Sequence, residues 1–129
     1  MSEHNALMVA RLDNARQCLI SAKTLLESAD YKGSANRSYY AIFHAMRATL
    51  AIDGFDSKKH SGIISEFRKR YIKTGILDIR LSKIIDVLFG IRNESDYEDF
   101  FVIVKEDVIQ QLENASAFVN AVEAYLKSI

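Results

Sequence analysis

Proline is absent from this chain of 129 residues, and glycine occurs only five times. With so few residues that break helices, the composition favours an all-helical fold. The single cysteine, Cys18, excludes an internal disulfide bond and a cysteine-based zinc site. The formal net charge is zero, because 17 basic residues balance 17 acidic ones. Overall charge therefore gives no reason to expect a protein that coats nucleic acid.

The chain also lacks an apolar run of membrane-spanning length and a basic-then-apolar signal sequence at its N-terminus. We therefore expect a cytoplasmic protein that has no membrane partner. Its length suits one domain, residues 1–129, and is too short for two. Apolar residues make up 49% and charged residues 26%, a mixture that is typical of a globular protein and argues against disorder.

Apolar residues recur at spacings of three and four along most of the chain, which is the pattern of amphipathic helices. The expected helices cover residues 3 or 5 to 28, 36–52, 58–73, 78–91 and 105–127, with 92–97 as a fraying end and 100–104 as an irregular packed connection. Their short connections predict a four- to five-helix up-and-down bundle, with the long first and last helices as its walls.

The expected helix boundaries rest on residues that favour turns and caps. Gly33 is expected to take a positive φ in the first turn, and Ser34 to cap the second helix. Ser57 is expected to cap the third helix and Gly75 to close it, while Asp78 is a candidate cap for the fourth.

The segment 36–52, NRSYYAIFHAMRATLAI, is the one around which the chain is organised. On a helix its residues separate into two faces. The apolar face carries Tyr39, Ile42, Phe43, Met46 and Leu50, and the polar face carries Arg37, Tyr40, His44 and Arg47. Such polar side chains can bind phosphate, stack on a base or move a proton. The alternative is an ordinary solvent-exposed face.

Charge is unevenly distributed along the chain. Residues 58–83 carry eight basic and two acidic side chains, a net +6, and residues 84–113 carry two basic and eight acidic ones, a net −6. One interpretation is two solvated helix faces that attract each other. The other is a basic patch on the third helix, formed by Lys58, Lys59 and 68–70, that meets an acidic partner or a phosphate backbone.

Histidine and arginine provide the remaining candidates for chemistry. His60 lies in the first turn of the third helix, where the helix dipole favours its neutral form. His44 and His60 show no metal-ligand spacing, so we predict no metal site and no cofactor. Arg92 follows an apolar stripe and precedes Asn93 and Asp96. It either caps the helix end and pairs with Asp96, or is held by Asp96 and directed at a phosphate.

Three segments together resemble one known family, the HEPN domain. Residues 36–44, NRSYYAIFH, are similar to its S-R-x-Y-Y-A-x-F-H signature. Residues 59–62, KHSG, resemble its K-x-H or K-H-x-G element, and residues 92–97, RNESDY, its R-x-x-A-D-Y element. The resemblance covers nearly the whole chain in the right order. It implies a helical bundle that dimerises through its central helices.

Many members of that family are RNA-cutting toxins of toxin–antitoxin pairs, and the antitoxin is often a nucleotidyltransferase. Their R-x(4–6)-H motifs meet at the dimer cleft. Here Tyr97 stands where that histidine is expected, with four residues between it and Arg92. Tyrosine, with an ordinary pKa of about 10, is a poor substitute for histidine in proton transfer near neutral pH.

Three functions therefore compete. The first is a dimeric module that binds nucleotide or RNA and acts with a nucleotidyltransferase partner. The second is a purely structural adaptor. The third is a metal-independent endoribonuclease in which His44 or His60 supplies the base in place of the missing histidine. The candidate catalytic residues are Arg92, His44, His60 and Tyr97. The candidate binding residues are Arg37, Tyr40, His44, Arg47, Lys59, His60, Arg92, Asn93, Asp96 and Tyr97.

Overall fold

The computed structural model describes the backbone of residues 3–97 and 102–129, and the side chains of residues 5–93 and 102–129. Within these residues it contains five α-helices, one π-helical turn and no strand, so the predicted all-helical fold is confirmed. The elements are α1 (Glu3–Glu27), α2 (Tyr31–Ile52), α3 (His60–Phe67), the π-helical turn η1 (Arg68–Ile72), α4 (Arg80–Tyr97) and α5 (Lys105–Ser128). None of the helices described has both the length and the hydrophobicity needed to cross a bilayer.

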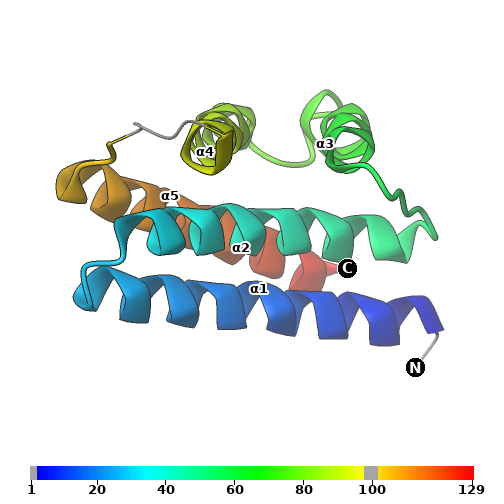
Figure 1. Cartoon of the computed structure of the whole chain (residues 1–129). Helices are drawn as coiled ribbons and strands as arrows, with labels where there is room; N and C mark the ends of the chain where they lie inside the picture. The colour runs from blue at the N-terminus through cyan, green and yellow to red at the C-terminus, as the bar shows by residue number, and fades with distance from the viewer. Residues whose placement is uncertain (1–2, 98–101) are drawn as a thin grey trace.

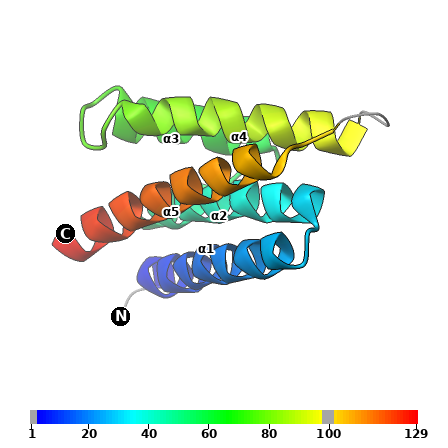
Figure 2. The same cartoon turned by 90° about the vertical axis from the view of Figure 1, so that its left-hand side faces the viewer.

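The helices form two layers. Figure 1 shows α1 and α2 as an antiparallel hairpin, with α5 beside α2. The second layer consists of α3 and α4, which cross over the first and are seen end-on in that view. Figure 2 shows the α3–α4 layer above α5 and α2, with α1 below them, on the side away from α3 and α4. Helices α1 and α5, the first and the last, both pack against α2.

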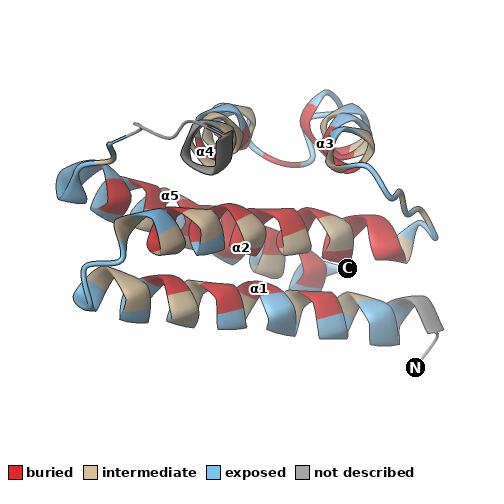
Figure 3. Cartoon of the chain, viewed as in Figure 1, coloured by how far each residue is buried: buried red, intermediate tan, exposed pale blue. Residues whose placement is uncertain are grey.

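Helix α2 is the centre of the core, and Figure 3 shows it as the most extensively buried helix. All five residues predicted for its apolar face are buried, and all but Phe43 are fully so. Alanines such as Ala41, Ala45 and Ala48 are buried as well, because α2 has neighbours on several sides. Their small side chains let those neighbours approach closely.

The turn between α1 and α2 differs from the prediction. Ala29, not Gly33, has the positive φ, at 63°. Asp30, not Ser34, caps α2, because its side chain accepts a hydrogen bond from the Gly33 amide at 2.9 Å. Ser34 lies inside the helix, fully buried, and its hydroxyl donates to the Ala22 carbonyl at 2.7 Å. Aspartate and serine both favour the N-cap position, and here the one that comes earlier in the chain, Asp30, is the cap.

The α3–α4 layer also corrects several boundaries. The predicted third helix is α-helical only to Phe67 and then continues as the π-helical turn. Lys59 is its N-cap residue, and Ser57 accepts from the Lys59 amide at 3.2 Å without capping the helix. Gly75 closes this segment with φ 78°, as predicted.

Helix α4 runs through Tyr97, so the expected fraying end at 92–97 is wrong as a statement about the backbone. The Asp78 carboxylate accepts from the Arg80 amide at 2.8 Å, which supports its predicted capping role. Of the expected irregular connection 100–104, residues 100 and 101 lie outside the described part, and 102–104 have no regular secondary structure. These boundaries matter because they place Arg92 within a helix.

Candidate functional site

The polar face of α2 meets the C-terminal half of α4 at Tyr40. The Arg92 guanidinium donates a hydrogen bond to the Tyr40 hydroxyl at 3.3 Å and to the Asn93 side-chain oxygen at 3.4 Å. Its carbon Cζ also lies 5.6 Å from the Tyr39 ring centre and 5.8 Å from that of Tyr40. A cation at this distance from a ring is attracted by the negative charge of its face. Helix α4 thus brings Arg92 onto two adjacent tyrosines.

His60, at the start of α3, is held by the same part of α2. Its Nδ1 shares a hydrogen bond of 2.7 Å with the Tyr39 hydroxyl, and its ring stacks on Phe43 with a centre-to-centre distance of 4.1 Å. The Tyr40 ring meets it edge-on at 5.8 Å. We refer to Tyr39, Tyr40, Phe43, His60 and Arg92 as the Arg92 cluster.

Burial sets the protonation of this cluster. Desolvation lowers the pKa of His60, and the charges of Arg92 and Arg47 lower it further. Its neutral form is therefore favoured, as predicted, although the causes are burial and arginines rather than the helix dipole. Burial also raises the pKa of Tyr39, so the phenol stays protonated. A neutral imidazole can accept a proton, and a guanidinium can bind phosphate.

A polar cavity opens on one side of His60. Its volume is about 560 Å³. The lining residues are Phe43, Arg47, Asp56, Ser57, Lys58 and His60. We call it the His60 pocket. Its cationic side chains and aromatic wall have the chemistry of a site for a phosphate beside a base.

One carboxylate holds this region together. Asp56 Oδ2 accepts from Arg11 at 3.1 Å and from Arg47 at 3.2 Å, and Arg11 also donates to the Arg47 carbonyl at 3.1 Å. These bonds join α1, α2 and the α2–α3 connection. Neither Arg11 nor Asp56 is among the site residues predicted from the sequence.

The other predicted binding residues lie in different surroundings. His44 is half-buried with its ring 6.2 Å from that of Tyr40, and burial, followed by Arg47, lowers its pKa. Arg37 is exposed and interacts with the Cys18 thiol of α1. Lys59 is exposed at the start of α3. The side chains of Asp96 and Tyr97 lie outside the described residues.

In the predicted basic patch, the positive charges of two arginines are neutralised by nearby carboxylates. Arg68 pairs with Asp86 at 2.6 Å, while Arg70 pairs with Glu66 at 2.8 Å and Asp53 at 3.5 Å. Lys58 lines the His60 pocket. The interpretation as helix faces that attract each other therefore holds for Arg68, because its partner lies in the acidic stretch.

The described residues contain no group of three or more histidine, cysteine, aspartate or glutamate side chains that could hold a metal ion. The arrangement instead offers a guanidinium, stacked aromatic rings and a neutral imidazole around one edge of α2. Those groups bind and orient anions and flat rings.

Comparison with known proteins finds one matching family model and several relatives. A family model described as HEPN domain matches residues 8–125. A UPF0332 protein of Thermotoga maritima is 30% identical over 129 residues, which cover 100% of this chain and 98% of the relative. Two proteins of Methanocaldococcus jannaschii named as putative toxins are 32% and 30% identical. Their matches cover 91% and 93% of this chain and 80% and 89% of the relatives.

Proposed function

The chain belongs to the HEPN domain family, and we propose that it is a nucleotide- or RNA-binding module of a toxin–antitoxin-like system. In this proposal it acts as a homodimer together with a nucleotidyltransferase partner, in the cytoplasm. The family membership and the toxin names of two relatives support the system. The binding activity is supported by the geometry of the site.

The observation that carries the proposal is the contact of Arg92 with Tyr40, whose ring also meets His60, a residue that lines the His60 pocket. A single-stranded RNA offers phosphates for a guanidinium and flat bases for aromatic rings. Arg92 and Lys58 supply charge, and the aromatic rings of Tyr40 and His60 supply apolar surface for a base. Because the net charge of the chain is zero, binding depends on this local arrangement rather than on a general positive field.

The test is a fluorescence-anisotropy titration of a labelled single-stranded RNA and of a labelled adenine nucleotide. We expect Arg92→Ala to weaken binding about tenfold, which corresponds to the loss of one charge-assisted contact. The matched control is Arg80→Ala, which removes an exposed arginine from the same helix. Equal affinities of the two variants would contradict the proposal.

A metal-independent endoribonuclease is the enzymatic alternative, and it is favoured by the neutral His60, which contacts the same two tyrosines, Tyr39 and Tyr40, as Arg92. Cleavage by attack of the 2′-hydroxyl needs a group that accepts its proton and a group that protonates the leaving 5′-oxygen. His60 would accept the 2′-hydroxyl proton, and the imidazolium so formed would give it to the leaving 5′-oxygen. We expect any cleavage in the presence of a chelator to be lost in His60→Gln. An intact RNA substrate after incubation with the clean wild-type protein would exclude this function.

Two other measurements test whether the protein is only a structural adaptor and whether it forms a homodimer. If Arg92 and Tyr40 only join helices, substituting either lowers the free energy of unfolding by about 1–3 kcal/mol and the wild type binds no RNA. For the dimer, light scattering at micromolar concentration should give about twice the chain mass. A monomer would contradict the dimeric part of the proposal but not the binding part.

A further inference from the structure

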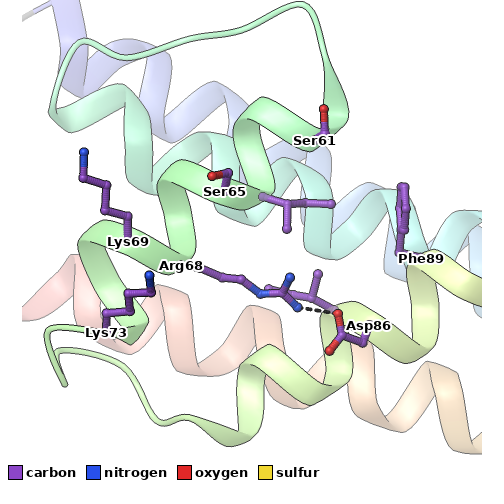
Figure 4. Close-up of a pocket in the computed structure, with 9 residues that line it drawn as sticks. Ser61, Ser65, Arg68, Lys69, Lys73, Asp86 and Phe89 are labelled. Atoms are coloured by element: carbon purple, nitrogen blue, oxygen red, sulfur yellow. Dashed lines mark hydrogen bonds and ion pairs between the residues drawn. The ribbon is translucent and has the colours of Figure 1, made fainter.

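A second cavity lies in the α3–α4 layer, and Figure 4 shows the side chains that line it. It lies between α3 with its π-helical turn and α4, and its volume is about 530 Å³. That is within the range of small-molecule sites. Its floor is apolar and consists of Ile64, Ile85 and Phe89, of which the two isoleucines are buried. We call this cavity the α3–α4 groove.

The basic residues of the groove differ in how far they are neutralised. Arg68 donates to Asp86 at 2.6 Å and to the hydroxyl and carbonyl oxygens of Ser82 at 2.9 and 3.0 Å, so its charge is already paired. Lys69 and Lys73 are exposed and have no ion pair within the part of the chain that the structure describes. Figure 4 shows both lysines at the end of the groove opposite Phe89. The groove is therefore apolar at one end and cationic at the other.

The backbone that carries these cations has an uncommon conformation. The Lys73 amide donates to the Arg68 carbonyl at 2.9 Å, five residues earlier, as in a π-helix. Short π-helical turns are rare and occur frequently at functional sites. Here the turn includes Arg68 and Lys69, and Lys73 is its C-cap residue, so it carries all three basic residues that line the groove.

We propose that the α3–α4 groove binds a small amphiphilic anion, a molecule with an aromatic or aliphatic body and a single carboxylate or phosphate group. The body covers the apolar floor, and the anionic group lies between Lys69 and Lys73. Ser61 and Ser65 line the wall, and their hydroxyls have no hydrogen-bond partner among the described residues. They are available to a polar group on the ligand.

A polyanion such as RNA fits this groove less well. Of the basic side chains that line the groove, Arg68 is already paired with Asp86, so only Lys69 and Lys73 remain for an anion and no cation is left for a second phosphate. The apolar floor offers no partner to successive phosphates. The groove shares no residue with the Arg92 cluster, so this inference does not depend on the proposed function.

The test uses probes that separate the two halves of the ligand. We would titrate the isotope-labelled protein with 1-naphthylacetate and 1-naphthyl phosphate and follow the amide signals of Ile64, Ser65 and Phe89. Acetate supplies the anion alone and 2-(1-naphthyl)ethanol supplies the body alone. We expect acetate and the neutral alcohol each to bind at least about fivefold more weakly than 1-naphthylacetate, the probe whose two halves they represent. The tighter of the two complete probes identifies the anionic group. Equal binding of the neutral alcohol would overturn the proposal.

Variants then locate the site. Replacing both lysines, Lys69→Gln with Lys73→Gln, should weaken binding of the better probe about 3- to 10-fold, while Lys83→Gln on α4, outside the groove, should not. Ser65→Phe places a ring in the groove and should abolish binding, with circular dichroism checking that the fold is kept. Arg92→Ala should leave probe binding unchanged, so the two proposals can fail separately. Unchanged affinity in the double lysine variant, or displacement of the probe by single-stranded RNA, would overturn the inference.

Discussion

The carboxylate of Asp56 is the clearest place to test how this fold holds its candidate site. Asp56 bridges Arg11 and Arg47, and Arg11 is only 6% exposed. The change Asp56→Asn keeps the shape of the side chain and removes its charge. Two guanidinium groups are then left next to each other, one of them buried, without a neutralising partner.

The size of the effect lies between two limits. Removing one partner of a fully buried ion pair costs about 3–5 kcal/mol, whereas an exposed pair contributes about 0.2–1 kcal/mol. The side chain of Arg11 is 8% exposed and that of Asp56 is 51% exposed, so solvent screens one end of the pair. We therefore expect Asp56→Asn to lower the free energy of unfolding by about 1–3 kcal/mol at pH 7.

The pH dependence of this loss has a definite sign. Partial burial works to raise the pKa of Asp56, but the Ser57 amide and then the Arg47 and Arg11 guanidiniums outweigh it and hold that pKa below its usual value. The ionised carboxylate therefore stabilises the fold above about pH 4, and this contribution disappears as the pH falls through the lowered pKa. The difference between wild type and variant should shrink accordingly.

Urea unfolding followed by circular dichroism measures this prediction. The matched control is Asp86→Asn, which removes a carboxylate from Arg68, a pair in which the carboxylate side chain is 71% exposed. The control should cost less than about 1 kcal/mol. If Asp56→Asn were no more destabilising than Asp86→Asn, the view that this bridge compensates a buried charge would be refuted.

Two further predictions concern the glycines and the histidines. Gly90→Ala should raise the free energy of unfolding by about 0.5–1 kcal/mol, because an added Cβ meets nothing within 4 Å in the middle of α4. Gly62→Ala should lack this gain or destabilise, because its Cβ would lie 2.5 Å from the Ser57 hydroxyl oxygen; thermal unfolding of both variants decides this. Stability should also fall between pH 7.5 and pH 5. Burial and neighbouring charges lower the pKa of His44 and His60, so below about pH 6.5 the unfolded chain binds protons that the folded chain does not. Urea unfolding at both pH values should show a smaller difference in a variant with both histidines changed to glutamine.

The sequence predicted the helices well where periodicity was the only information needed. The apolar face of α2 was identified correctly because burial follows directly from a spacing of three and four. The turn at Ala29 was not predicted, because alanine has no preference for a positive φ. The end of α4 was misplaced because no glycine or proline marks it, and polar residues continue a helix as readily as they end one.

The candidate site was only partly predictable for a different reason. The polar face of α2 indicated Tyr40, and the matched motif indicated Arg92, but nothing in the sequence gives the distance between them. Asp56 and Arg11 are 45 residues apart, and no pattern connects them. Contacts between elements depend on how those elements pack, which periodicity does not determine.

Tyr39 shows why the site and the core cannot be separated in this fold. Its ring is fully buried and lies 5.8 Å from the Phe89 ring, while its hydroxyl holds His60. The sequence assigned it to the apolar face alone, because an aromatic residue at helical spacing usually belongs to the core. A substitution at Tyr39 therefore changes core packing and the position of His60 together, and loss of activity in such a variant would not identify the cause. Arg92 and Asp56, which are less buried, allow the two effects to be measured independently.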